Sequence, residues 1–73
     1  MPRTHHVGWS ALTEGEWRVV ALAAQGHTNT EIAGRLFLSR YTVETHLKHA
    51  FAKLGVASRA ELAALVAGRA EST

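Results

Sequence analysis

The chain of 73 residues contains no cysteine and no aspartate, and its only proline is Pro2. Without cysteine it can form neither a disulfide nor a thiolate metal site. Without aspartate it cannot build a Ser-His-Asp catalytic triad. It also lacks a glycine cluster that could cradle phosphates, an HExxH zinc motif and an apolar run long enough to span a membrane. These absences leave little basis for an enzyme, and we expect no catalytic residues, no cofactor, no metal ion and no membrane partner.

The residues that are present favour a small helical domain. Hydrophobic residues make up 47% of the sequence, many of them alanine, and the formal net charge is +2 with histidine neutral. A chain of this length forms one domain, near the lower limit for folding on a hydrophobic core alone. The small positive charge is compatible with a nucleic-acid partner and is weak evidence for one.

Residues 39–54 are predicted to form the longest helix. Ser39 is placed to cap its start, and Gly55 is placed to end it. Its apolar residues recur at steps of three and four, the spacing of one helix face: Val43, Leu47, Ala50 and Leu54. We expect Leu47 and Leu54 to be buried.

The opposite face of this helix is chemically mixed. At the same helical spacing it carries Tyr41, Glu44, Thr45, Lys48 and Ala52. A phenol, a carboxylate, a hydroxyl and a cation with little bulk suit the base edges of a DNA major groove. Taken alone, however, the pattern is better explained by an ordinary solvated helix face.

Three further helices begin at capping signals. The segments Thr13–Glu16, Thr28–Glu31 and Ser58–Glu61 each place a serine or threonine three residues before a glutamate, which is the pattern of a capping box. Gly34 lies inside the second helix, where a close helix crossing would explain a residue without a side chain. Gly68 is expected to end the last helix.

Only Phe37 and Leu38 separate the second helix from the cap of the third, which is the spacing of a helix-turn-helix. The fold class is therefore predicted to be all-α, a four-helix helix-turn-helix domain over residues 12–68. Residues 1–11 show no periodicity, and we interpret them as a flexible N-terminal tail or the remnant of a linker, although Trp9 could fold back onto the first helix. Residues 69–73 are expected to fray.

The last helix is apolar around more of its circumference than one core contact requires. Its small residues could form a dimer surface, or they could simply permit close packing inside the domain. These residues are Ala63, Ala64 and Ala67.

Four blocks of residues occur in a specific order along the chain: Leu12–Glu16, Gly26–Ala33, Leu38–His46 and Lys53–Arg59. They resemble the patterns LTxRE, GxSNxEIA, LxISxxTVxxH and KLGVxxR of the DNA-binding domain of LuxR-type transcriptional regulators. The resemblance stays in register from residue 12 to about residue 66. It implies a four-helix domain whose third helix enters the major groove and whose fourth helix commonly mediates dimerisation.

The chain departs from the family pattern at three positions. Gly15 stands where arginine is usual, Thr30 where lysine is common, and Glu44 where a base-reading lysine is frequent. The last departure changes the expected base preference. Alternatively, Glu44 pairs with Lys48 one helical turn later and never meets a base.

The base contacts are assigned to three residues that share one face over a single turn. The carboxylate of Glu44 can accept from cytosine N4, and the ammonium of Lys48 can donate to guanine O6 or N7. The methyl group of Thr45 can meet a thymine methyl.

Residues at helix starts are predicted to hold DNA phosphates with the help of backbone N–H groups: Thr28, Asn29, Arg40, Tyr41 and Thr42. Arg35 and Lys53 are expected to add further phosphate contacts. Glu16 and Arg59 also match family positions, and we expect them to have structural roles in capping and pairing.

We therefore expect double-stranded DNA as the partner of a cytoplasmic transcriptional regulator. A homodimer through the last helix and a sensory domain preceding this one in a longer protein complete the prediction. Two alternatives stay open: region 4 of a sigma factor, which also places a helix-turn-helix on promoter DNA, and a small helical interaction module that never touches DNA. The KLGVxxR block and the helix after it favour the LuxR type, whereas the lack of a strongly basic patch would favour the interaction module.

Overall fold

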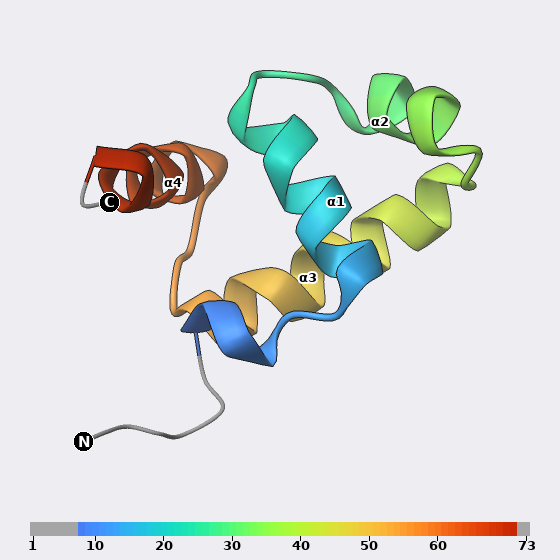
Figure 1. Cartoon of the computed structure of the whole chain (residues 1–73). Helices are drawn as coiled ribbons and strands as arrows, with labels where there is room; N and C mark the ends of the chain where they lie inside the picture. The colour runs from blue at the N-terminus through green and yellow to red at the C-terminus, as the bar shows by residue number, and fades with distance from the viewer. Residues whose placement is uncertain (1–7, 72–73) are drawn as a thin grey trace.

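The computed structural model describes residues 8–71, with side chains through residue 68, and its regular secondary structure is helical throughout that range (Figure 1). A 3₁₀ helix precedes four α-helices: η1 (Gly8–Ala11), α1 (Glu14–Ala24), α2 (Asn29–Leu36), α3 (Arg40–Leu54) and α4 (Arg59–Glu71). The predicted all-α, four-helix fold is confirmed. Figure 1 shows α2 at the N-terminal end of α3 and η1 near its C-terminal end. No helix within residues 8–71 is long and apolar enough to cross a membrane.

The first two α-helices begin at complete capping boxes. The hydroxyl of Thr13 accepts a hydrogen bond from the Glu16 backbone N–H at 3.1 Å, and the Glu16 carboxylate accepts one from the Thr13 N–H at 3.0 Å. Thr28 and Glu31 make the same pair of bonds at 3.1 and 2.9 Å. Because the reciprocal bonds satisfy N–H groups that a helix start leaves unpaired, these two boundaries were predictable from the sequence.

The start and the end of α4 differ from the prediction. Ser58 caps the helix by accepting from the Glu61 N–H at 3.1 Å, but the Glu61 carboxylate accepts from the Ala57 N–H at 2.6 Å instead of returning to Ser58. The helix does not end at Gly68 and continues to Glu71. Gly68 does not adopt the left-handed backbone of a helix end, and one glycine costs a helix interior only about 1 kcal/mol.

The turn between α2 and α3 has a left-handed backbone at Phe37, with φ 58° and ψ 43°. The next residue, Leu38, donates its N–H to the carbonyl of Ala33 at 2.9 Å, so the chain passes from α2 into α3 within three residues. The close helix crossing predicted at Gly34 is wrong, because Gly34 is exposed and an added Cβ would meet no atom within 4 Å.

The amphipathic pattern of α3 is confirmed with one correction. Ser39 caps its start by accepting from the Thr42 N–H at 3.0 Å, and Gly55 ends it with φ 72°. Leu47 is buried as predicted, but Leu54 is only half-buried because it is the last residue of the helix and lies at the edge of the core.

The core is shared by all four α-helices, with α1 packing against both α3 and α4, and α2 packing against α3. The buried hydrophobic residues are Val19, Val20, Ala23, Ile32, Ala33, Val43, Leu47, Ala50 and Leu62. This core holds the polar face of α3 outward.

The last four residues of the predicted tail are ordered, so that prediction is wrong for residues 8–11. The ring of Trp9, in η1, meets the ring of Trp17, in α1, edge to face at a centroid distance of 5.1 Å. Trp9 also packs against the core, and η1 lies on α3. Tertiary packing therefore orders a segment that has no periodicity of its own. The rest of the predicted tail, residues 1–7, lies outside the described part.

Candidate nucleic-acid interface

The outward face of α3 carries the residues predicted to touch DNA. Arg40, Tyr41, Glu44 and Lys48 are exposed, while Thr42 and Thr45 are half-buried. Lys48 makes no hydrogen bond or ion pair with another residue of the described part. Its ammonium is therefore available to an external acceptor.

Glu44 pairs with the residue one turn before it and not with the residue one turn after. One carboxylate oxygen of Glu44 lies 3.8 Å from Nη2 of Arg40. The sequence alternative, a pair with Lys48, is not found. Both side chains are more than half exposed, and ion pairs of this kind contribute little to stability because water and salt screen them.

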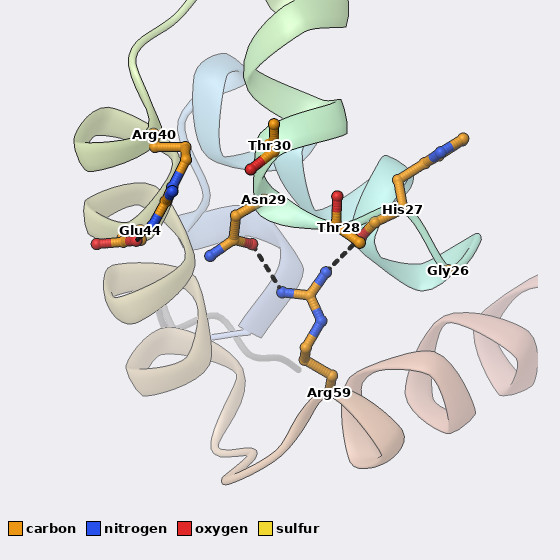
Figure 2. Close-up of a pocket in the computed structure, with 8 residues that line it drawn as sticks. All are labelled: Gly26, His27, Thr28, Asn29, Thr30, Arg40, Glu44 and Arg59. Carbon is orange, nitrogen blue, oxygen red and sulfur yellow. Dashed lines mark hydrogen bonds and ion pairs between the residues drawn. The ribbon is translucent and has the colours of Figure 1, made fainter.

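A hollow of about 460 Å³ opens where the starts of α2, α3 and α4 come together (Figure 2). The residues that line it are Gly26, His27, Thr28, Asn29, Thr30, Arg40, Glu44 and Arg59. Two guanidinium groups and the N-terminus of α2 thus face a common space. A helix N-terminus carries free N–H groups and partial positive charge, so this arrangement suits an anion such as a DNA phosphate.

The start of α2 is held in place around this hollow. Besides the capping box, the ring Nδ1 of His27 lies 3.4 Å from Oε1 of Glu31. The hydrogen bond from the Thr28 backbone N–H lowers the pKa of Glu31, and the neighbouring His27 lowers it further. The ionised form of Glu31, which caps the first turn of α2, therefore persists to lower pH than in an unperturbed glutamate.

Arg59, the first residue of α4, joins this helix to the start of α2. Its Nη1 donates to Oδ1 of Asn29 at 2.9 Å, and its Nη2 donates to the backbone carbonyl of His27 at 2.6 Å. The predicted structural role in pairing is confirmed. Arg59 and His27 also line the hollow. This was not predictable from the sequence, because residues about 30 positions apart are brought together only by the tertiary fold.

Lys53 has a structural partner rather than an open position. Its Nζ lies 2.7 Å from Oε1 of Glu16, and Nδ1 of His49 lies 3.8 Å from Oε2 of the same carboxylate. Burial by itself would raise the pKa of Glu16, but the hydrogen bonds from Lys53 and the Thr13 backbone, with the charges of Lys53 and His49, bring it below its ordinary value. The predicted phosphate contact of Lys53 gains no support, and the structural role predicted for Glu16 is confirmed.

Among the described residues, no group of three or more histidine or acidic side chains could hold a metal ion.

The fold brings some of the predicted DNA residues together and leaves others apart. Thr28, Asn29, Arg40 and Glu44 line the hollow. The other predicted contacts lie outside it: Arg35, Tyr41, Thr42, Thr45, Lys48 and Lys53. The surface therefore divides into the hollow at the helix starts and the outward face of α3 beside it.

The alanines proposed for a dimer surface lie on α4 with different exposure. Ala64 and Ala67 are exposed, and Ala63 is half-buried. The exposed pair leaves part of α4 uncovered, while Leu62 from the same helix is fully buried in the core.

The tight turn between α2 and α3, the exposed polar face of α3 and the hollow beside it define a helix-turn-helix DNA-binding domain. The family described as bacterial regulatory proteins, luxR family, matches residues 10–66. The chain belongs to this family of bacterial regulatory proteins.

Proteins named as HTH-type transcriptional regulators are similar to this chain. One from Mycobacterium bovis is 54% identical over 55 residues, which is 75% of this chain and 6% of the relative. One from Mycobacterium tuberculosis strain H37Rv is 53% identical over the same length. The regulator MalT of Serratia proteamaculans is 44% identical over 52 residues, 71% of this chain and 6% of MalT. The chain thus spans a small fraction of the length of these relatives.

Proposed function

We propose that this domain binds double-stranded DNA sequence-specifically as the output domain of a transcriptional regulator, with α3 in the major groove. The observation that carries the proposal is the outward face of α3, where Glu44, Thr45 and Lys48 stand opposite the buried stripe and beside the hollow. An α-helix fits the major groove, and these three side chains match the groove edges of cytosine, thymine and guanine.

The phosphates on either side of the groove are assigned to residues around the hollow and along the helix starts. These are Thr28, Asn29, Arg40, Tyr41 and Thr42, with Arg35 at the end of α2. Hydroxyl, amide and guanidinium donors at helix starts hold the backbone and set the register of α3 without reading sequence. We leave Lys53 out of this set because its ammonium pairs with Glu16.

The test is binding to duplex DNA as a function of salt, followed by selection of bound sites from a random pool. Two cations, Arg40 and Arg35, are assigned to phosphates, and Arg59 and Lys48 lie close by. The slope of log K against log salt is therefore expected to lie between roughly −2 and −4. Selection is expected to return a preferred motif containing guanine and cytosine. Absence of salt-dependent duplex binding would instead favour the helical interaction module, and binding without any preferred motif would refute base reading.

Lys48→Ala tests the base contact most directly. We expect specific sites to weaken by about 1–3 kcal/mol, with relaxed preference at one position, because a lost guanine contact penalises only the sites that contain that base. Arg18→Ala is the matched control, since it also removes one exposed cation, but from α1, where Arg18 pairs with Glu14. Equal losses on specific and random DNA would place Lys48 on a phosphate instead.

The assembly is proposed on the same basis. Because the chain covers 6% of the relatives' length, we infer that it is the C-terminal part of a longer cytoplasmic regulator with a sensory domain before it. A homodimer through Ala63, Ala64 and Ala67 of α4 would place two copies of α3 on two half-sites. Sedimentation of the wild type and of Ala64→Arg, with and without duplex, tests the dimer.

A further inference from the structure

The side chain of Arg59 links the first turn of α2 to α4 across the hollow (Figure 2). It holds two acceptors at once, the side-chain oxygen of Asn29 at 2.9 Å and the backbone carbonyl of His27 at 2.6 Å. Both acceptors belong to residues that flank the N-cap Thr28. The guanidinium therefore fixes a side chain as well as a backbone.

The bond to Asn29 determines which end of the amide faces outward. A guanidinium carries only donors, so the amide must turn its oxygen toward Arg59. Figure 2 shows the Asn29 side-chain nitrogen directed away from Arg59. The NH₂ group is thus the part of this side chain left for an external partner, next to the unpaired N–H groups of the first turn of α2.

Orientation matters at this position because the two ends of an amide act oppositely on an anion. The NH₂ group donates to a phosphate oxygen, whereas the carbonyl oxygen repels it. An amide without a fixed partner can rotate and present either end. With Arg59 in place, the repelling oxygen is occupied before DNA arrives.

We propose that Arg59 is a positioning residue for DNA binding, acting through Asn29 to hold the amide NH₂ toward a backbone phosphate. The inference rests on the proposed function and adds to it a residue of α4, a helix outside the helix-turn-helix. It differs from a purely structural role, in which Arg59 would only tie α4 to the carbonyl of His27.

A double-mutant cycle on the full 73-residue chain separates the two roles. The dissociation constant for a short mixed-sequence duplex is measured by fluorescence anisotropy for wild type, Arg59→Met, Asn29→Ala and the double variant. If Arg59 acts through Asn29, Arg59→Met weakens binding by about threefold to tenfold more in the wild type than in the Asn29→Ala background. The lost charge of Arg59 is common to both backgrounds and cancels. An equal factor in both backgrounds overturns the proposal.

Asn29→Asp provides a test that does not depend on Arg59→Met folding. The carboxylate still accepts from Arg59, so the bridge and the thermal midpoint are retained, but no donor remains for a phosphate. Thr30→Asp is the matched control, because it adds the same charge at the next residue of α2. We expect Asn29→Asp to lose about threefold or more affinity beyond Thr30→Asp. Equal losses overturn the proposal, since charge alone then explains them.

The side-chain NH₂ resonances of Asn29 give a direct readout in the wild type. Nuclear magnetic resonance is expected to show that they shift when duplex is added, and that this shift is smaller in Arg59→Met, where the amide can turn away from the phosphate. If the Asn29 NH₂ resonances do not shift although the domain binds the duplex, the inference is overturned and the proposed function is not. A wild type that binds no duplex at all overturns the proposed function, and the inference with it.

Discussion

Phe37 occupies a backbone conformation that ordinary side chains avoid, and it does so with its ring in solvent. It is the only non-glycine residue of the described part with a positive φ, and it is 94% exposed. The turn requires this geometry because Leu38 must donate back to Ala33 only two residues after α2 ends. The left-handed conformation costs an L-residue roughly 1–2 kcal/mol, and here no burial of the ring offsets it.

Phe37→Gly is therefore expected to stabilise the domain. Relief of the left-handed strain, reduced by the larger entropy of glycine in the unfolded chain, leaves a gain of about 0.5–1 kcal/mol in the free energy of unfolding. Chemical denaturation followed by circular dichroism measures it. Phe37→Ala is the control, because it removes the ring and keeps the strain, and it should change stability by less than about 0.5 kcal/mol. If Phe37→Gly instead lowers the free energy of unfolding, the exposed ring makes contacts that stabilise the fold.

Glu44 is a carboxylate on a face that is proposed to approach phosphates. Glu44→Lys is expected to raise affinity for all DNA, to steepen the salt dependence by about one phosphate equivalent, and to shift preference away from cytosine at one position per half-site. Salt titrations and selection from a random pool measure these effects.

Glu14→Lys is the matched control for that variant, since Glu14 also forms an exposed pair with an arginine four residues away, on α1. It carries the same charge change without facing the groove and should leave the selected motif unchanged. Identical motifs for wild type and Glu44→Lys would make Glu44 a surface charge.

Two glycines show where residue-level prediction from sequence stops. Gly15 departs from the family pattern, and a Cβ there would lie 3.2 Å from Nε2 of His46 on α3, a close contact that the His46 ring would have to accommodate. Gly34 was predicted to permit a close helix crossing, but no other helix packs against it and it faces open space. Local patterns identify a glycine but do not identify what lies opposite it.

At the level of elements, the buried end of the α1 capping box ties two helices together. The Glu16 carboxylate caps α1 and holds Lys53 of α3 at 2.7 Å, and it is 4% exposed. The fold lowers the pKa of Glu16 below its ordinary value of 4.5. The ionised form is therefore favoured by folding, so its contribution is complete above the ordinary value and is lost as the pH falls toward the lowered one.

Stability should consequently decline as the pH falls below about 5, and Glu16→Gln should show a shallower decline because it has no charge to lose. Thermal midpoints followed by circular dichroism between neutral and acid pH measure the difference. Glu31→Gln is the comparison, since the pKa of Glu31 is also lowered but its side chain is exposed. If the thermal midpoint falls with decreasing pH equally in Glu16→Gln and in wild type, Glu16 is not the group responsible for the acid sensitivity.

Element boundaries were predictable where a local signal sets them and not elsewhere. Thr13, Thr28 and Ser39 cap the helices that the sequence assigned to them. The 3₁₀ helix η1 was missed because it depends on Trp9 meeting Trp17, which leaves no periodic trace in the sequence. The end of α4 was misplaced because Gly68 is tolerated inside a helix when nothing requires the chain to turn.

At the level of the whole molecule, α4 completes the core mainly through Leu62, with Val66 packed beside it. Leu62 is fully buried, whereas Leu65 on the same helix is half-buried. Leu62→Ala is expected to lower the free energy of unfolding by about 2–5 kcal/mol, a large part of the total for a small domain.

Leu65→Ala serves as the control for this change and should cost clearly less. Urea denaturation compares the two variants with wild type. Equal and small losses would mean that α4 contributes little to the core. In that case α4, which contributes Arg59 to the lining of the hollow, can separate from the domain while the other helices stay folded.

The architecture was predictable from one sequence, because the helical periodicity, the capping signals and four ordered motifs all indicate the same fold. The hollow was not predictable. It is formed by residues from the starts of α2, α3 and α4, and its geometry depends on Arg59 reaching Asn29 across 30 positions of sequence.

The edge-to-face contact between Trp9 and Trp17 also determines what optical spectroscopy will report on this domain. These are the only tryptophans of the chain, so all of its indole fluorescence originates where η1 meets α1. Emission is therefore a local gauge of that junction and not of the helix-turn-helix. The single tyrosine, Tyr41, is 77% exposed at the start of α3. Its phenol already meets water in the folded domain, so unfolding changes the tyrosine signal little, and loss of the helix-turn-helix has to be followed with an introduced probe.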